Sequence, residues 1–556
     1  MRKTRPSTLL ARDASSREDS IQGSWLEALP FLILALAVPV VVLLQAARST
    51  QLELMILFED DAYYYFRIAR NLAEGLGSTF DGINPTNGYH PLWMALLTPL
   101  FWLLEDRFTS LVAVKALSAF FWVASIALIY LIARRYRAKI AFGLALPVVL
   151  VTRHYWFNGL ETNVFLTFLL AFGLAWPGLV DPERSRRVDV WLGAFLLALM
   201  ALARLDSVFF VGVAGVLLVV VPTGRPMAER LRRAFAVLTP AAVVVALYCL
   251  GNWLVFGSVV PVSGRAKGLG PDFSNWGILG TFWRMNPFES NLTQHLSTGS
   301  LLILLVAPAL VVGLRLARTS PKQNRAVGGW VLFVLLLVLA NALQLLYYAA
   351  FTSWPLWRWY YYYLPLMFLF SLALILQGLL AVLPLIRRWA SLAAVTIALL
   401  LCAYVARGGL WIEHALAANE SYKTFSVLMA NRLNVESPAD AILAMGDRAG
   451  SLGYLLDRPL VQLEGLVNSS EYLERLSAGE MIPYLREQGV THFLYSGPWV
   501  AAGETLDSLP CKVINQPLHG GGPKERFELC LDEAVFVRRL LIRTNHLEVY
   551  GVWDFP

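Results

Sequence analysis

Long apolar runs dominate this chain between residues 25 and 406, and they constrain its fold more than any other feature. The chain is 57% hydrophobic and only 15% charged, with a mean hydropathy of +0.56. Soluble domains carry about 25% charged residues. Because a water-soluble fold could not bury this much apolar surface, lipid must solvate much of the chain. The sequence therefore predicts a polytopic α-helical membrane protein.

A segment that crosses a bilayer must satisfy its own backbone, which favours helices of about 20 apolar residues. We expect about eleven such helices. They are 26–47, 109–133, 140–153, 163–180, 190–204, 207–222, 235–256, 299–315, 328–350, 361–384 and 389–406. The run at 91–105 is short for a span, and we interpret it as an interfacial or re-entrant helix of the first external loop.

Clusters of Lys and Arg predict the orientation, because short basic loops stay on the cytoplasmic side. These clusters all fall on one side of the predicted membrane, which places the N-terminus in the cytoplasm and the C-terminal part outside. They lie in the N-terminal tail and at 134–139, 184–187, 225–233, 315–325 and 387–388. We therefore expect a multi-pass protein of the cell membrane. Its predicted parts are a cytoplasmic tail at 1–24, a transmembrane module at 25–406 with a long first external loop at 48–108, and an extracytoplasmic domain at 407–556.

The C-terminal 407–556 region has the composition of a soluble domain. Apolar stretches such as AILAM, THFLYS and AVFVRRLLI alternate with helix-like segments such as KTFSVLMANRL and EYLERLSAGEMIPYLREQG. This alternation predicts an α/β fold with short strands. Cys511 and Cys530 are disulfide candidates if the domain faces an oxidising space, and reduced thiols otherwise. Cys249 and Cys402 lie in apolar runs and are interpreted as packing residues.

The first external loop carries the densest group of acidic residues. Glu59, Asp60 and Asp61 directly follow the first span. Adjacent like charges need a cation, a metal or solvent to compensate them. A helix cap needs one carboxylate rather than three, so capping alone explains the group poorly. The next segment, AYYYFRIARNLAEG, predicts a helix that Gly75 and Gly77 end.

Two other groups offer acidic or paired side chains close to the membrane. Glu161, in the external stretch RHYWFNGLET, is either a second acidic site residue or a solvated side chain. Arg204 and Asp206 lie between two spans, where charge is costly. They therefore either act at a site or form a local salt bridge.

External basic residues offer positive charge for an anionic ligand. Arg265, Lys267 and Arg358 lie in the later external loops, where they could hold a phosphate or extend toward lipid headgroups. No Gly-rich phosphate loop, zinc-ligand pattern or nucleophile elbow is present in the sequence. The basic residues follow membrane topology, so no nucleic-acid partner is expected.

These motifs together resemble the GT-C superfamily of membrane glycosyltransferases, such as protein O-mannosyltransferases, the aminoarabinose transferase and arabinofuranosyltransferases. The resemblance rests on EDDAYYYFRIARN after the first span, on TNGYHPLW before an amphipathic helix and on NGLET in the second external loop. It implies that Asp61, with Asp60 beside it, is the catalytic base. It also implies that His90 contributes to the substrate site, together with Glu59, Glu161 and the basic residues above.

The resemblance further implies a sugar donor linked to polyprenyl phosphate and an extracytoplasmic glycan, lipid or protein as acceptor. Whether a divalent metal between Asp61 and Glu161 takes part stays open, since hard cations favour carboxylates. Two other functional classes remain. A transporter or flippase of a lipid-linked glycan would need charges deep in several spans and repeated halves, and no repeat is seen. A membrane scaffold would not depend on Asp61.

Overall fold

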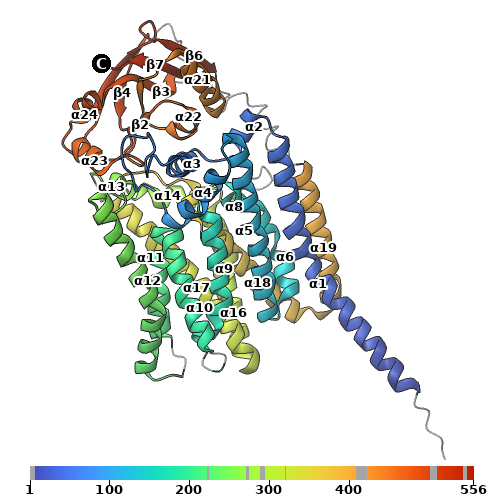
Figure 1. Ribbon diagram of the computed structural model, residues 1–556. Helices are drawn as coiled ribbons and strands as arrows, with labels where there is room; N and C mark the ends of the chain where they lie inside the picture. Colours follow the sequence, from blue (N-terminus) through green and yellow to red (C-terminus); the bar gives the residue numbers. More distant parts are fainter. Residues whose placement is uncertain are drawn as a thin grey trace, which may run out of the picture.

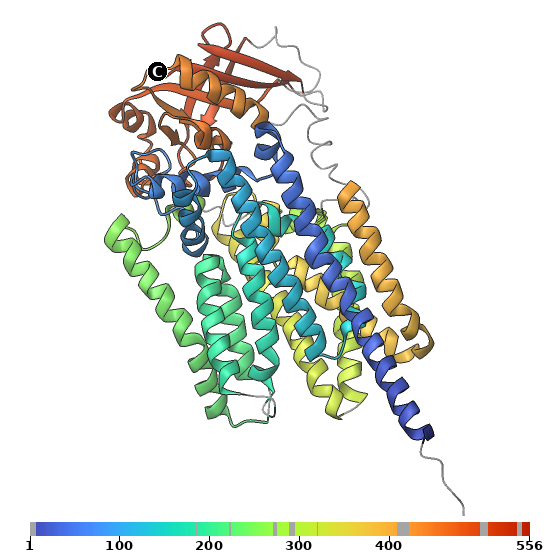
Figure 2. The ribbon, with the colours of Figure 1, turned by 45° about the vertical axis from the view of Figure 1, so that its right-hand side comes forward.

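The computed structural model has a helical bundle with a smaller α/β domain at one end (Figures 1 and 2). It describes residues 7–181, 183, 186–221, 224–270, 275–288, 295–319, 321–407, 422–500, 510–541 and 547–556. The described residues of 422–556 pack on the end of the bundle that also carries the first loop, while the start of helix α1 extends from the opposite end. The predicted fold class, a polytopic helical protein with a C-terminal α/β domain, is confirmed.

Eight helices of the described chain are long and apolar enough to cross a membrane. These stretches are Trp25–Arg48, Arg107–Arg135, Thr162–Val180, Met227–Phe256, Thr298–Ala317, Val327–Phe351, Arg358–Val382 and Leu385–Arg407. They belong to α1 (Ser7–Arg48), α5 (Arg107–Arg135), α9 (Thr162–Val180), α12 (Met227–Phe256), α15–η3–α16 (Thr298–Leu301, Leu302–Val306, Ala307–Thr319), α17 (Pro321–Phe351), η4–α18 (Arg358–Tyr361, Leu364–Val382) and α19 (Pro384–Arg407).

The predicted count of eleven spans is not confirmed, because three predicted spans are short helices. They are α6 with α7 (Lys139–Ala145, Pro147–Val151), α10 (Arg187–Ala203), and η1 with α11 (Leu205–Ser207, Val208–Val220). At about 1.5 Å per residue, a helix of this length is shorter than the roughly 30 Å apolar core of a bilayer. The run at 91–105 forms α4 (Pro91–Leu103), which is also too short to span and packs beside α3 (Asp60–Ala73) of the same loop (Figure 1).

The first external loop forms compact helices at the end of the bundle. They are α2 (Gln51–Ile56), α3 (Asp60–Ala73) and α4. As predicted, glycines end α3, because Gly75 and Gly77 adopt left-handed φ angles of 81° and 85°. Three short helices follow from later loops. They are α8 (His154–Phe157), α13 (Val262–Lys267) and α14 (Gly277–Arg284).

The C-terminal domain is built on a mixed five-stranded sheet of order β2-β1-β3-β7-β6 and a separate β4-β5 hairpin. Its strands are β1 (Ile442–Met445), β2 (Leu460–Gln462), β3 (Val490–Val500), β4 (Cys511–Gln516), β5 (Glu525–Cys530), β6 (Phe536–Leu541) and β7 (Leu547–Asp554). Its helices are α21 (Tyr422–Glu436), α22 (Ala449–Leu455), α23 (Ser470–Ser477) and α24 (Met481–Glu487). Stacked rings of Phe493 and Phe527, 4.5 Å apart, join the sheet to the hairpin.

Strands β1, β2 and β3 are mutually parallel, and helices make the connections between them. Strand β2 lies on one side of β1 and β3 on the other, so the chain changes direction in the sheet at β1. In such sheets ligands bind outside the carboxyl ends of the strands at this switch point. The carboxyl ends of β1 and β2 are therefore the places in this domain where a site is most expected.

Helix α22 of the C-terminal domain packs against the first loop. The Tyr454 ring packs against Tyr63 and Phe66 of α3, and its hydroxyl donates to the Arg107 carbonyl at 2.6 Å. Arg67 of α3 donates in turn to the Leu456 carbonyl at 3.1 Å. Because these groups are largely buried, the contacts fix the domain over the loop that carries the predicted acidic site.

Candidate active site

The side chains of the three adjacent acidic residues in the first loop lie in three different environments. Glu59 is the N-cap of α3, and Asp60 and Asp61 are its first two residues. Successive side chains of a helix turn by about 100°, so neighbours in sequence face different directions. Glu59 lines a cavity with Lys115 and Lys423, whereas Asp61 lines two other cavities. This divergence explains how three acidic residues coexist without sharing one site.

Asp60 binds the start of helix α22 in the C-terminal domain. Its carboxylate accepts backbone N–H hydrogen bonds from Gly450 at 2.9 Å and Ser451 at 3.0 Å. Burial raises the pKa of Asp60, while Lys423 and the bonds from Ser451 oppose the increase. The sequence predicts that Asp60 and Asp61 lie in one cavity with Glu161. Asp60 lines neither cavity that Asp61 lines, so this prediction is wrong for Asp60. Its geometry is that of an anchor between loop and domain.

Asp61 is half-buried between the first loop and later segments of the chain. Desolvation raises its pKa to about 7, and the nearby Lys267 ammonium opposes that increase. Asp60, Asp447 and Glu59 add smaller contributions that raise the pKa further. A carboxylate with a pKa near neutrality can take up and release a proton under physiological conditions, which suits a general base.

The first cavity lies beside the transmembrane helices and contains both signs of charge. Its lining includes Asp61, His90, Glu161, Arg204, Lys267 and Tyr360. The Arg204 guanidinium lies 2.6 Å from Glu161 and 3.1 Å from Asp206. Lys267 donates a hydrogen bond to the Tyr360 hydroxyl, and its ammonium lies 4.9 Å from the Tyr360 ring centre. The structure thus brings together five of the predicted site residues.

Tight packing at Gly159 places Glu161 in this cavity. Gly159 has a φ of 87°, and a Cβ atom there would lie 2.6 Å from the Phe58 ring and 2.9 Å from Ala62. Glycine therefore lets the NGLET turn contact the start of α3. Glu161 follows as the N-cap of α9, directly across from the first loop.

His90 has one ring nitrogen already committed to the backbone. Its Nδ1 accepts the Leu205 N–H at 3.2 Å, which leaves the proton of a neutral ring on Nε2. Nε2 lies 3.6 Å from Glu161 Oε1, and burial lowers the pKa of His90. His90 is therefore a neutral donor that faces the cavity at physiological pH.

Besides Asp60, three predicted site residues lie outside both cavities that Asp61 lines. Glu59 lines the cavity that contains Lys115 and Lys423. Arg265 Nη2 lies 3.8 Å from Glu474 Oε1 of α23. Arg358 lines neither cavity, and its backbone carbonyl accepts the Tyr155 hydroxyl. Arg204 and Lys267 are therefore the basic residues that share a cavity with Asp61 and Glu161, and a part of these three residues in substrate binding stays a prediction.

The second cavity is formed largely by residues that the sequence motifs did not indicate. It shares Asp61, Tyr64, Lys267 and Tyr360 with the first cavity. The C-terminal domain adds polar groups, and the loop before η4 adds two indole rings. These additional residues are Asp447, Gln462, Glu464, His519, Trp354 and Trp357. Asp447 and Gln462 stand at the carboxyl ends of β1 and β2, so the parallel-strand rule was the one signal that could have found them.

The second cavity contains buried polar atoms, only some of which have a hydrogen-bond partner among the described residues. Glu464 accepts the backbone N–H groups of Leu518 and His519 at 2.6 and 2.9 Å, and burial raises its pKa to about 7. Gln462 Nε2 and His519 Nε2 have no hydrogen-bond partner among the described residues. Such groups cost about 1–3 kcal/mol each when left unsatisfied, so they favour a polar ligand.

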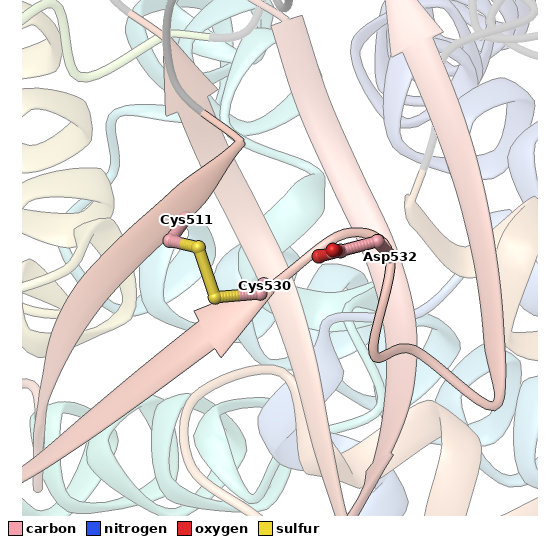
Figure 3. A group of neighbouring side chains, drawn as sticks. All are labelled: Cys511, Cys530 and Asp532. Atoms are coloured by element: carbon pink, nitrogen blue, oxygen red, sulfur yellow. A yellow bond between two sulfur atoms is a disulfide. The ribbon is translucent and has the colours of Figure 1, made fainter.

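The one group of three or more possible metal ligands found among the described residues lies elsewhere. It comprises Cys511, Cys530 and Asp532, and both cysteine sulfurs belong to a disulfide (Figure 3). A disulfide sulfur offers no thiolate to a metal. The predicted metal candidates Asp61 and Glu161 share the first cavity, where Glu161 already pairs with Arg204.

The fold of the chain is similar to that of a solved structure. The crystal structure of ArnT from Cupriavidus metallidurans bound to undecaprenyl phosphate matches with a TM-score of 0.56. The match covers 94% of this chain and 97% of that chain at 13% identity. This chain has the GT-C membrane glycosyltransferase fold.

The GT-C fold is what the first-loop motifs predicted, and this part of the prediction is confirmed. A second match is archaeal oligosaccharyltransferase AglB from Archaeoglobus fulgidus, in complex with an inhibitory peptide and a dolichol-phosphate. This match has a TM-score of 0.43 and 12% identity, and it covers 83% of this chain and 69% of that chain. No family model and no curated protein sequence matches the chain.

Proposed function

We propose that this protein is a membrane glycosyltransferase that moves a sugar from a polyprenyl-phosphate donor to an extracytoplasmic acceptor. The observation that carries the proposal is the position of Asp61 at the junction of two cavities of different chemistry. One cavity has cations beside the transmembrane helices, and the other has aromatic and polar groups from the C-terminal domain.

The first cavity suits the phosphate of the donor. Lys267 places positive charge there, beside the Arg204 guanidinium that Glu161 and Asp206 compensate, and a leaving phosphate is stabilised by preorganised charge in a low-dielectric site. Tyr360 holds the Lys267 ammonium in position. The undecaprenyl phosphate bound to ArnT supports a lipid phosphate as the ligand class.

The second cavity suits the acceptor. Its tryptophan and tyrosine rings can cover the apolar face of a sugar, while Asp447, Gln462 and Glu464 can bind hydroxyl groups. The acceptor would therefore enter between the C-terminal domain and the first loop, which gives that domain a role in acceptor choice.

In the proposed reaction, an acceptor hydroxyl oxygen attacks the anomeric carbon of the donor sugar. The bond from that carbon to the phosphate oxygen breaks, and polyprenyl phosphate leaves with the electron pair. Asp61 takes the hydroxyl proton, a contribution of about 10²–10⁴-fold to the rate. Attack from the face opposite the phosphate inverts the anomeric centre.

We infer that the N-terminus is cytoplasmic and that residues 407–556 are extracytoplasmic. The one-sided distribution of Lys and Arg clusters supports this orientation. The disulfide between Cys511 and Cys530 also supports it, since disulfides persist in oxidising compartments. The proposed active site then faces the outer side of the cell membrane.

The test replaces Asp61 in the full-length protein. A strain lacking the gene is complemented with the wild type, with Asp61→Asn or with Asp532→Asn, and envelope lipids and glycans are compared by mass spectrometry. Asp532 is an exposed carboxylate that lines neither cavity at Asp61, so its variant is the matched control. We expect wild type and Asp532→Asn to restore the glycosylated product and Asp61→Asn to lose it. Full product with Asp61→Asn would refute the proposed role and favour a transporter or scaffold.

A further inference from the structure

A third cavity lies inside the C-terminal domain, between the five-stranded sheet and the β4-β5 hairpin. It is lined by the segment after β1 (Gly446–Arg448), by Leu494–Pro498 of β3 and by Lys512–Gln516 of β4. This position is outside the carboxyl end of β1, at the switch point between β1 and β3. The topology therefore places the cavity where α/β sheets commonly bind ligands.

The third cavity adjoins the second. Asp447 lines both, and the consecutive residues Leu518 and His519 line the third and the second respectively. The second cavity in turn shares Asp61 with the first. A continuous series of cavities thus leads from Asp61 across the C-terminal domain, which is more length than one acceptor sugar needs.

Positive charge is in excess in the third cavity. Arg448, Lys512 and Lys524 line it, against the single carboxylate of Asp447 at its junction with the second cavity. Arg448 pairs with Glu548 at 2.9 Å. The two lysines instead donate to backbone carbonyls, Lys524 to Leu518 at 2.8 Å and Lys512 to Pro498. A carbonyl oxygen orients an ammonium without neutralising its charge, so both lysines can attract an anion.

Uncharged groups in the same cavity suit a carbohydrate. The buried Gln516 Oε1 has no hydrogen-bond partner among the described residues and can accept one from a sugar hydroxyl. Tyr495 adds an aromatic ring to the lining. At Gly446 a Cβ atom would lie 2.3 Å from Gln516 Oε1, so glycine is what lets this amide occupy its position.

We propose that the acceptor is an extended anionic carbohydrate chain. Its reactive end lies in the second cavity at Asp61, and its following units occupy the third cavity, where Lys512 and Lys524 bind their negative groups. This proposal rests on the proposed glycosyl transfer for the direction of the chain. It adds the chemical class and the length of the acceptor.

The experiment measures binding to the full-length protein in detergent, so that it does not depend on turnover. Labelled oligogalacturonates, hyaluronan fragments and phosphomannan fragments are compared with neutral malto-oligosaccharides, each from the disaccharide upward. The double variant Lys512→Gln/Lys524→Gln removes both charges, and Lys512→Arg/Lys524→Arg keeps them. Arg458→Gln is the matched control, because Arg458 is a basic residue of the same domain that donates to the Pro438 carbonyl and lines none of these cavities.

We expect at least one anionic series to bind more tightly as its chain lengthens, and more tightly than neutral chains of equal length. The glutamine double variant should weaken that binding about tenfold, while the arginine variant and Arg458→Gln should retain it. The proposal is overturned if no anionic chain exceeds its neutral counterpart, or if the glutamine variant binds as well as the wild type. Turnover is measured separately with Asp61→Asn. Turnover that survives this change would refute the catalytic proposal and leave the result of the binding experiment intact.

Discussion

Glu161 and Arg204 form a buried ion pair, in which Arg204 Nη1 lies 2.6 Å from Glu161 Oε1. The two residues come from different turns, at the N-cap of α9 and the C-cap of α10. Arg204 also contacts Asp206 at 3.1 Å, so one guanidinium compensates two carboxylates. This asymmetry makes the three residues unequal in their effect on stability.

We therefore expect Arg204→Gln to destabilise the protein more than Glu161→Gln. Loss of Arg204 leaves two buried carboxylates uncompensated, and breaking a buried pair in this way costs about 3–5 kcal/mol. After Glu161→Gln, Asp206 still compensates Arg204. Thermal unfolding in detergent would measure both variants. An equal or larger loss of stability for Glu161→Gln would contradict this account.

The pH dependence of transfer should follow the ionisation of Asp61. A base must be deprotonated to act, and burial raises the pKa of Asp61 to about 7. The rate should therefore rise with pH through about 7 and level off above it. Lys267 lowers this pKa, so Lys267→Gln should move the inflection to higher pH. Profiles of kcat/KM against pH would check the shift, and an unmoved inflection would speak against their coupling.

Removal of the Asp60 carboxylate should loosen the contact between the first loop and α22. Asp60→Ala leaves the N–H groups of Gly450 and Ser451 without their acceptor, at a cost of about 1–3 kcal/mol. Hydrogen exchange at these two amides should become faster. Glu74→Gln is the control, because this exposed carboxylate of the same loop bonds only to the nearby Arg70 among the described residues. Unchanged exchange in Asp60→Ala would remove the anchoring role.

The proposed orientation predicts where a C-terminal reporter works. Alkaline phosphatase fused after Pro556 should be active, since it needs an oxidising extracytoplasmic space. Green fluorescent protein fused at the same place and exported in the unfolded state should stay dark. The opposite pair of results would place the C-terminal domain in the cytoplasm.

The sequence by itself determined the membrane class, most of the long spans and the α/β character of the C-terminal domain. These features depend on local patterns, because a span needs a run of apolar residues and a strand or helix needs its own periodicity. The EDDAYYY motif likewise indicated Asp61 and the GT-C fold. Predicted strands at AILAM, THFLYS and AVFVRRLLI correspond to β1, β3 and β6.

Only the tertiary structure decided which charged residues meet. Asp60 and Asp61 are adjacent in sequence, yet the turn of α3 sends one to α22 and the other to the cavities. Asp447 and Glu464 reach the same cavity as Asp61 from about 400 positions away along the chain, through docking of a separate domain. No local pattern specifies that approach, because it depends on how two packed surfaces fit once each has folded.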